Sequence, residues 1–495
     1  MKRNFTLFSI VLAAAVVASA NNYTTPGNCS VLTFDALSDI EESGVIKMDE
    51  NVYILNDSIT VAATDTLRLD NNATLQLNDL VCITVNGVAD FCPADTANIE
   101  NLNETDDLPL GLMVFDDETE GTAYGKFKNI TFNGTGIAYG CTKGLHVDNC
   151  TFTNVKQPSQ GAISYFRTGA ENIVENSTFV ENPVPAIAAG ANCYVGVIFR
   201  NNYLYDNNST NNNRPFISLT VAGENNVEII GNTIVGAKRN MVGGIAVANL
   251  LGYKGTNKVI IKGNHVSDCR YGANTTGPNI NAEYIDNIFI NNKYESNAMN
   301  GGSGINVFDP YYTQNAIIKG NYIEGSLWGI TVIGCNNVNI GKTNDPNAED
   351  YNPGNNVFKD NGNGGVLYDL YNNSSNLIYA QGNTWNVDEQ TREKIETVIF
   401  HQADNEKLGK VVFMPGETGV STIATDNNSV RYDAASKSLI LANIADKVTV
   451  YSANGSVVAS ASATDNVSVN TLSRGIYIAR IVNGTNTTTL KFSVK

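Results

Sequence analysis

One short phrase recurs between Phe127 and Trp385 and constrains the fold more than any other feature of the chain. An alternating apolar segment is followed by Asn or Gly-Asn and then, a short step later, by another apolar residue. Ten such apolar anchors are separated by 20 to 35 residues, with a mean of (385 − 132)/9, or about 28. The anchors are Phe132, Phe152, Phe179, Leu204, Ile234, Val266, Ile290, Ile323, Phe358 and Trp385. A repeat of this length is typical of stacked supersecondary units, so the sequence predicts a solenoid.

A second ladder, offset from the first, keeps the same period. Its members are Ile163, Ile187, Ile217, Ile245, Ile305, Ile330 and Val366. Counting the gap from Ile245 to Ile305 as two coils gives seven intervals that average 203/7, or 29 residues. The strands are short, alternate with period two and have no helical pattern between them, which favours parallel coils over hairpins or a βαβ sheet.

Parallel coils stack equivalent residues on top of one another at about 4.8 Å, so the anchors should form one continuous apolar column. The recurrent Asn fits a bent corner of each coil, because Asn tolerates the left-handed conformation and stacked amides can bond to one another. We therefore expect buried, mutually bonded amides at Asn232 and Asn264.

Composition limits the class of protein. Residues 1–20 carry Lys2 and Arg3, an apolar run and a small-residue end, which predicts a cleavable secretion signal too short to span a bilayer. Removing this segment changes the formal net charge from −17 to −19, which disfavours nucleic acid as a partner. The chain has no pair of Cys or His residues at the short spacing that zinc sites use. Cys82 and Cys92, ten residues apart, are expected either to form a disulfide or to be two small buried side chains.

The chain divides into four parts on the sequence evidence. After the signal at 1–20, residues 21–415 form the solenoid, with an N-terminal capping helix at 34–43 and a C-terminal cap at 388–401. Residues 416–422 are expected to be a linker. The pattern of 423–495 changes to about seven short strands with tight turns, which predicts a small antiparallel β-sandwich. No transmembrane segment is expected.

Resemblance to known families extends these expectations. Segments such as Val259–Asn264 and Gly329–Val332 resemble the repeat of the right-handed parallel β-helix superfamily, also called pectin-lyase-like, over roughly residues 30–415. The resemblance implies an all-β, right-handed parallel β-helix solenoid of roughly ten to thirteen coils followed by the small antiparallel β-sandwich. It specifies the fold far better than the function.

The tail resembles another family. Val448–Val458, Leu472–Ile478 and Lys491–Lys495 are similar to the C-terminal sorting domain of type IX secretion cargo. That resemblance implies that residues 423–495 engage the type IX secretion machinery, and that the protein is secreted or held at the outer-membrane surface of a Gram-negative bacterium. In that family the domain is commonly removed after passage across the outer membrane.

One solvent-facing row offers candidate chemistry. The position four residues before each anchor should face solvent. On three successive coils this position is occupied by Asp148, Glu175 and Arg200. Two carboxylates could bind Ca²⁺ as metal ligands, while Arg200 acts as the catalytic base that removes the proton alpha to a uronate carboxylate. The alternative is a ladder of charges that pair across strands on a wet face.

Aromatic residues follow several strands of the second ladder and offer a second candidate site. If these loops lie on one rim, their rings can stack on sugar faces while charged groups bond to hydroxyls. The candidate ligand-binding residues are Tyr165, Arg167, Asp309, Tyr311, Tyr312, Asp369 and Tyr371. The alternative is that the tyrosines shield the backbone of turns.

Two functions from different classes remain. The favoured one is a secreted or cell-surface β-helix that binds glycan or another surface ligand without catalysis and without a cofactor. The alternative is a polysaccharide lyase or related carbohydrate-active enzyme, assisted by Ca²⁺ and acting on an acidic polysaccharide through Asp148, Glu175 and Arg200.

Overall fold

The structure is a computed structural model that describes residues 22–102, 111–115, 123–417 and 430–494, with short gaps at 142, 157–159, 167–168, 221–225, 256, 435 and 485. Contacts divide the chain into two compact units, Met1–Glu417 and Thr418–Lys495. The secretion signal expected at 1–20 lies outside the described residues, as does most of the linker expected at 416–422.

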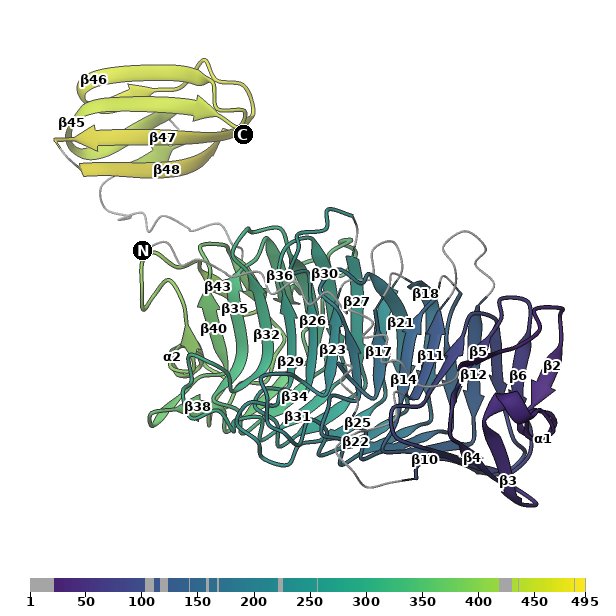
Figure 1. The fold of residues 1–495 in the computed structure, drawn as a ribbon. Helices are drawn as coiled ribbons and strands as arrows, with labels where there is room; N and C mark the ends of the chain where they lie inside the picture. The colour runs from purple at the N-terminus through teal and green to yellow at the C-terminus, as the bar shows by residue number, and fades with distance from the viewer. Residues whose placement is uncertain are drawn as a thin grey trace, which may run out of the picture. The chain divides into compact units, whose positions relative to one another are not determined.

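Three long sheets wind around a common interior in the first unit (Figure 1). Sheet A comprises β1 (Asn22–Thr24), β5 (Ser58–Val61), β8 (Cys82–Val85), β11 (Gly111–Phe115), β14 (Ile137–Gly140), β17 (Ile163–Tyr165), β20 (Ile187–Ala189), β23 (Ile217–Thr220), β26 (Ile245–Ala248), β29 (Ala273–Thr276), β32 (Ser303–Asp309), β35 (Trp328–Gly334), β40 (Leu370–Asn373) and β42 (Ile399–Phe400). Sheet B comprises β2 (Val31–Thr33), β6 (Thr66–Leu69), β9 (Val88–Phe91), β12 (Tyr124–Lys128), β15 (His146–Asp148), β18 (Gly169–Glu175), β21 (Val195–Arg200), β24 (Asn226–Ile230), β27 (Asn257–Lys262), β30 (Ile280–Ile285), β33 (Asn315–Lys319), β36 (Asn337–Gly341), β41 (Ile378–Ala380) and β43 (Val411–Val412). Sheet C comprises β3 (Val45–Asp49), β4 (Val52–Leu55), β7 (Thr74–Leu77), β10 (Ala97–Asn101), β13 (Ile130–Asn133), β16 (Thr151–Thr153), β19 (Thr178–Val180), β22 (Tyr203–Tyr205), β25 (Thr233–Val235), β28 (His265–Ser267), β31 (Ile288–Ile290), β34 (Tyr322–Glu324) and β37 (Val357–Lys359).

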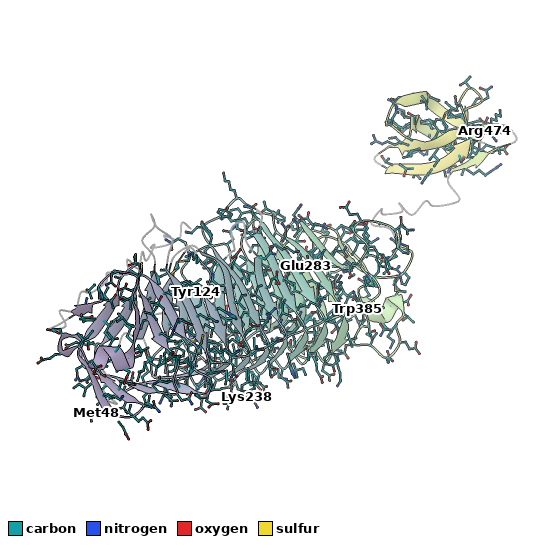
Figure 2. All side chains as sticks on the ribbon, turned by 90° about the vertical axis from the view of Figure 1, so that its right-hand side faces the viewer. Met48, Tyr124, Lys238, Glu283, Trp385 and Arg474 are labelled. Carbon is teal, nitrogen blue, oxygen red and sulfur yellow. The ribbon has the colours of Figure 1, made fainter. Side chains whose placement is uncertain are left out.

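Within these three sheets each described pairing is parallel except that of β3 with β4. Each coil contributes one strand to each sheet, which defines a parallel β-helix and confirms the predicted solenoid. Sheets of 14, 13 and 14 strands place the number of coils at or just above the upper end of the predicted range. Figure 2 shows Met48 near one end of this unit and Trp385 near the other.

The anchors of the first ladder form the apolar column that was predicted. Phe132, Phe152 and Phe179 pair in register, and their rings stack at 4.6 and 4.8 Å between centroids. One anchor was wrong: Phe289, and not Ile290, pairs with Val266 and is buried. The correct register follows from Asn287, which lies two residues before Phe289 just as Asn264 lies two residues before Val266.

The second ladder corresponds to sheet A. β29 supplies the coil missing between Ile245 and Ile305, since Ala273 pairs with both. The last member was wrong, because Leu370 and not Val366 pairs with Ile330. Val366 belongs to an exposed hairpin formed by β38 (Gly362–Asn363) and β39 (Val366–Leu367), which is inserted before the strand and repeats its apolar pattern.

A buried amide ladder connects the coils at the corner between sheets B and C. In each step the side-chain Nδ2 of one Asn donates to the Oδ1 of the Asn in the next coil, at 2.9 or 3.0 Å. The same Oδ1 also accepts the backbone N–H of the preceding Asn. The ladder contains Asn202, Asn232, Asn264, Asn287, Asn321, Asn356 and Asn383.

The left-handed conformation belongs to a neighbouring residue and not to the ladder Asn itself. The residue before each ladder Asn has a positive φ, for example Asn201 at 55° and Gly231 at 64°. In the earlier coils Asn149 and Asn176 take this left-handed position, while Cys150 and Ser177 occupy the buried one. The repeated Asn of the sequence therefore fills two adjacent positions with different physical requirements.

Asn264→Leu is expected to lower the free energy of unfolding by about 1 to 3 kcal/mol, because it leaves buried donors and acceptors of the neighbouring coils unpaired. Asn281→Leu, which changes an exposed amide on the outer face of sheet B, is the matched control and should have a much smaller effect. Thermal or denaturant unfolding of the two soluble variants measures the difference. An unchanged melting temperature for Asn264→Leu would contradict a stabilising role of the ladder.

Both ends of the solenoid carry short helices. At the N-terminus, α1 (Phe34–Ser38) and the 3-10 turn η1 (Glu41–Ser43) replace the single helix expected at 34–43. Thr33 caps α1 by accepting the N–H of Ala36, and the buried Phe34 and Leu37 join the core. Near the C-terminal end α2 (Arg392–Glu396) begins after Thr391, later than the expected start at Asp388.

The second unit is one antiparallel sheet of five described strands, and not the seven short strands that were expected. They are β44 (Val430–Asp433), β45 (Ser438–Ser452), β46 (Val457–Ser468), β47 (Gly475–Asn483) and β48 (Asn486–Val494). Register shifts interrupt the pairing of β45 with β46, and they break the alternation that makes a long strand recognisable in the sequence.

The disulfide considered for Cys82 and Cys92 is absent, and both side chains are free thiols. Cys82 begins β8 of sheet A, whereas Cys92 directly follows β9 of sheet B. The two strands belong to different sheets of the solenoid. The other alternative holds: Cys82 is a small buried side chain and Cys92 a partly buried one.

Candidate functional site

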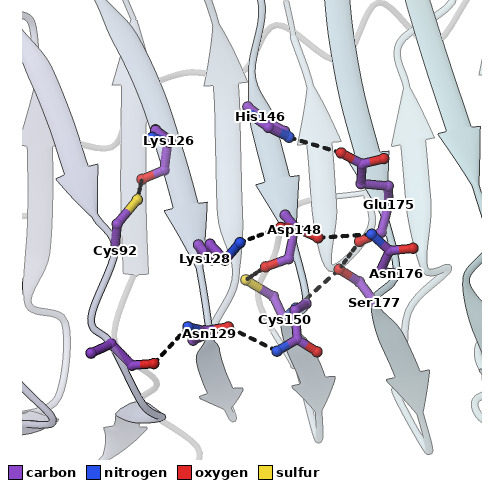
Figure 3. Close-up of polar contacts among 12 residues, drawn as sticks. Cys92, Lys126, Lys128, Asn129, His146, Asp148, Cys150, Glu175, Asn176 and Ser177 are labelled. Carbon is purple, nitrogen blue, oxygen red and sulfur yellow. Dashed lines mark hydrogen bonds and ion pairs between the residues drawn. The ribbon is translucent and has the colours of Figure 1, made fainter.

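The row of charges predicted from the anchor spacing exists on the outer face of sheet B. Lys128, Asp148, Glu175 and Arg200 pair in register on four successive strands. Figure 3 shows part of this row, in which Lys128 contacts Asp148 at 3.0 Å and His146 contacts Glu175 at 3.1 Å. Arg200 completes it, since its Nη2 and Nε lie 2.6 and 2.7 Å from one oxygen of Glu175.

These contacts occupy the groups that the lyase hypothesis requires. Partial burial opposes ionisation of Glu175, but hydrogen bonds from His146 and Arg200 outweigh it and hold the pKa of Glu175 below its ordinary value. The pKa of Asp148 is lowered in the same way, with bonds from Asn176 and Lys128 exceeding the effect of burial. Each carboxylate is paired with a cation of a neighbouring strand, so the row has the geometry of a charge ladder.

No cluster of three or more His, Cys, Asp or Glu side chains suited to a metal ion occurs within the part of the chain that the structure describes. Asp148 and Glu175 each bond to cationic neighbours. A Ca²⁺ ion at this row would have to displace Lys128 from Asp148 and Arg200 from Glu175.

Several residues predicted to bind a ligand are instead buried in the fold. Tyr165 is buried and packs edge-on against Tyr139, with ring centroids 6.3 Å apart. Asp309 is fully buried and accepts the N–H groups of the turn that follows it, including those of Tyr311 and Gln314. These placements do not support a direct ligand contact. Arg167 lies outside the described residues.

Asp369 is also fully buried, at the start of β40. Its carboxylate accepts the N–H of Asn386 at 2.8 Å and the amide of Asn361 at 3.3 Å. Burial raises the pKa of Asp369 to about 7, although these two bonds oppose the shift. Asp369 was predicted to face solvent because Val366 was aligned with Ile330. The residue that pairs with Ile330 is Leu370, four positions later, so Asp369 directly precedes a core strand.

The remaining predicted residues do reach the surface, but in two places. Tyr311 and Tyr312 lie exposed on the turn after β32. Tyr371 lies inside β40 and points outward from sheet A, since its neighbours Leu370 and Asn372 are buried. The predicted single rim is therefore wrong, and Tyr371 belongs to a groove on the outer face of sheet A.

This groove, called here the tryptophan groove, has a volume of about 250 Å³. Its floor consists of outward side chains from successive strands, among them Asn274, Asn306, Phe308 and Thr331. Asn306 donates to the Oδ1 of Asn274 at 2.8 Å. Among the described residues, the Nδ2 of Asn274 and the Oδ1 of Asn306 have no other partner, so both can bond to a ligand.

Aromatic rings form one side of the tryptophan groove. Trp328 and Tyr371 stack with their centroids 5.1 Å apart and their planes at 25°. Tyr368 and Phe400 pack behind them, at 4.7 Å from Trp328 and 5.3 Å from Tyr371. The cluster holds two large rings rigidly at the groove, which is the arrangement that stacking on a flat ligand requires.

A loop held against the sheet also lines the groove. Trp328 donates its indole N–H to the carbonyl of Ala298 at 2.7 Å. Arg270 donates to the carbonyl of Asn300 at 2.6 Å and pairs with Glu295 at 3.6 Å. These bonds fix residues 298–301 as a wall, so the groove is formed before any ligand binds.

Sequence reasoning missed Trp328, Asn274 and Asn306. A signal was available for Asn274 and Asn306, because each lies next to a buried residue of sheet A and must therefore face outward. Trp328 lies two residues before the buried Ile330, so alternation would place it inward, and its position in the groove follows only from the structure. The missing information was which outward row lies beside the 298–301 loop. That proximity depends on the path of a segment without any repeat.

Comparisons with known proteins identify the second unit. Residues 424–495 match the family described as the secretion system C-terminal sorting domain. This tail directs export by the type IX secretion system to the cell surface or the extracellular space, as the sequence predicted. In the described residues no helix is both long and apolar enough to cross a bilayer.

Comparison of the whole chain with curated sequences and solved structures adds little on function. No curated sequence matches the chain significantly. A solved tailspike protein, gp49 of the Acinetobacter baumannii bacteriophage Fri1, described as a capsular polysaccharide depolymerase, shares 10% identity over 86% of this chain and 73% of its own. Its TM-score of 0.23 is too low to bear on function, so the function is argued from the geometry of this chain.

The raised pKa of Asp369 predicts a pH-dependent stability. The folded pKa of about 7 exceeds the unfolded value near 4, so the neutral acid stabilises the fold at low pH and this contribution is lost as the pH rises through 7. Between pH 5 and 8 the free energy of unfolding of the wild type should fall by about 2 to 3 kcal/mol more than that of Asp369→Asn. Thermal unfolding at both pH values measures this, with the exposed Asp345→Asn as control; equal pH slopes for wild type and Asp369→Asn would contradict it.

Proposed function

We propose that the protein is a type IX secretion cargo whose solenoid binds an uncharged polysaccharide in the tryptophan groove. The observation that carries this proposal is a rigid aromatic pair, Trp328 and Tyr371, set beside amides with unused bonding groups on Asn274 and Asn306. Sugars combine apolar ring faces with hydroxyls, and they are bound by this combination of rings and amides.

The charge of the groove favours a neutral ligand. None of the described residues that line it carries a formal charge, and the chain as a whole has a formal net charge of −17. An acidic polysaccharide would meet no cation in the groove and would be repelled by the surrounding field. A neutral glycan meets neither penalty.

The same lining favours binding over turnover. Glycoside hydrolysis and uronate elimination both need a positioned acid or base. The titratable side chains among the described lining residues are Tyr271 and Tyr371, and burial raises the pKa of both above the ordinary value of tyrosine. Neither phenol is prepared to give up a proton near neutral pH.

The polysaccharide lyase remains the alternative, because Asp148, Glu175 and Arg200 do lie on successive coils as it requires. Incubation with a panel of uronate polymers and Ca²⁺ tests it through the absorbance of unsaturated products. A product signal that disappears in Arg200→Ala would establish the lyase and displace the binding proposal. A panel without product, together with binding of a neutral glycan, would support the binding proposal.

Glycan binding should depend on Trp328. Affinity electrophoresis or calorimetry with neutral β-glucans, mannans, xylans and N-acetylglucosamine polymers is expected to detect binding by the wild type. Trp328→Ala should weaken it more than about tenfold, because loss of a central aromatic contact commonly costs 2 kcal/mol or more.

Two further variants guard this test against misfolding. Asn306→Ala keeps the aromatic cluster and should also weaken binding, since it removes an amide from the groove floor. Tyr203→Ala removes an exposed ring from sheet C and should leave binding unchanged. If Trp328→Ala binds as well as the wild type, the groove is not the binding site.

Export should depend on the second unit. Deletion of residues 424–495 is expected to abolish delivery to the cell surface and medium. The solenoid should then remain on the periplasmic side of the outer membrane. Because the two units are separate compact bodies, the truncated solenoid should keep its melting temperature. Fractionation and immunoblotting of the producing bacterium measure the first effect; a truncated protein that still reaches the medium would contradict it.

A further inference from the structure

A second groove adjoins the tryptophan groove at the turns that follow β26, β29 and β32. It has a volume of about 570 Å³ and is lined mainly by apolar side chains, among them Leu250, Leu251, Pro278 and Tyr311. We call it the leucine groove. Phe308 lines both grooves, so the two meet at this side chain.

The apolar side chains of the leucine groove are unusually exposed for their type. Leu250, Leu251 and Tyr311 have 64%, 56% and 70% of their surface accessible. Scattered single apolar residues are common on protein surfaces, but a contiguous group in a concave site marks a place where a ligand is bound.

Buried polar groups hold these exposed side chains in position. Asn249 donates from its side chain to the carbonyls of Tyr253 and Pro278, and accepts the N–H of Tyr253 at 2.8 Å, which closes the turn bearing Leu250 and Leu251. Asp309 accepts N–H groups of the turn bearing Tyr311. The groove is thus rigid before binding, which lowers the entropic cost of binding a ligand.

The backbone between the two turns is shaped to let them approach. Gly277 has a φ of +102°, and a Cβ at this position would lie 2.4 Å from the carbonyl oxygen of Asn249. A side chain there would clash with the backbone of the turn that follows β26. Only glycine permits both the conformation and the close contact.

We infer that the leucine groove is an apolar subsite of the glycan site, and that the polysaccharide bound there is neutral and carries acetyl groups. This inference rests on the proposed function. None of the described residues lining the groove is charged, so it offers nothing to an ionic substituent. A bare sugar chain has too little apolar surface to cover Leu250, Leu251 and Tyr311, whereas an acetyl group supplies a methyl for the groove and a carbonyl that can bond at its edge.

The test compares one polymer in two forms. The neutral polysaccharide bound best by the wild type is prepared both partially O-acetylated and de-esterified with alkali, and oligomers of N-acetylglucosamine and of glucose with the same linkage provide an N-acetyl pair. The acetylated member of a pair should bind about fourfold more tightly for each methyl group buried.

The variant Leu250→Ser/Leu251→Ser should lose this preference and retain the affinity for the unacetylated form. Both leucines are exposed, so the double substitution spares the core. Ile288→Ser, which changes an exposed apolar residue on sheet C, is the matched control and should keep the preference.

The outcomes separate the two proposals. If neither form of any neutral polymer binds, the proposed function fails. If both forms bind equally to the wild type, or if the double variant keeps the preference, the acetyl subsite is overturned while the glycan site stands. Loss of preference in the double variant alone, for O-acetyl or N-acetyl ligands, supports the inference and identifies which linkage the groove accepts.

Discussion

In-register stacking of parallel coils is the constraint on which the rest of this structure depends. Each coil is too small to bury its own apolar residues, so it is stable only when the equivalent residues of its neighbours cover them. Phe132, Phe152 and Phe179 show the result, with nearly parallel rings one coil apart. The ladder through Asn232 and Asn264 extends the same principle to polar groups, since each amide is satisfied by its copy above and below. A shift of one residue in register would leave both columns without partners.

Stacking also gives each outer face a character of its own. On sheet B one outward row holds two adjacent carboxylates, Asp148 and Glu175, and each pairs with the cation on its other side, Lys128 or Arg200. On sheet A the outward positions of β29, β32, β35 and β40 are uncharged amides, hydroxyls and rings. The first face has little bonding capacity left, whereas the second keeps amide groups available. This difference, and not the fold, favours sheet A as the binding surface.

Much of the fold could be predicted from the sequence because the repeat is visible in it. The period of about 28 residues implied parallel coils, and the spacing from the anchors correctly placed Asp148, Glu175 and Arg200 in one row. The errors occurred where the repeat is interrupted. Val366 was assigned to the ladder because the β38–β39 hairpin mimics a strand, and that error moved Asp369 from the core to the surface. In the tail, bulges made long strands look like several short ones.

The sequence by itself determined the stacking of the coils, which side chains form each ladder and the export tail, since these follow from periodic patterns and local motifs. Only the tertiary structure decided how the tryptophan groove is assembled. The groove joins Trp328, Asn306 and Tyr371 from separate coils to a loop at 298–301 that no repeat describes, and bonds from Trp328 and Arg270 fix that loop in place. Such a site depends on distances between residues far apart in the chain, and periodicity contains no information about the path of an irregular loop.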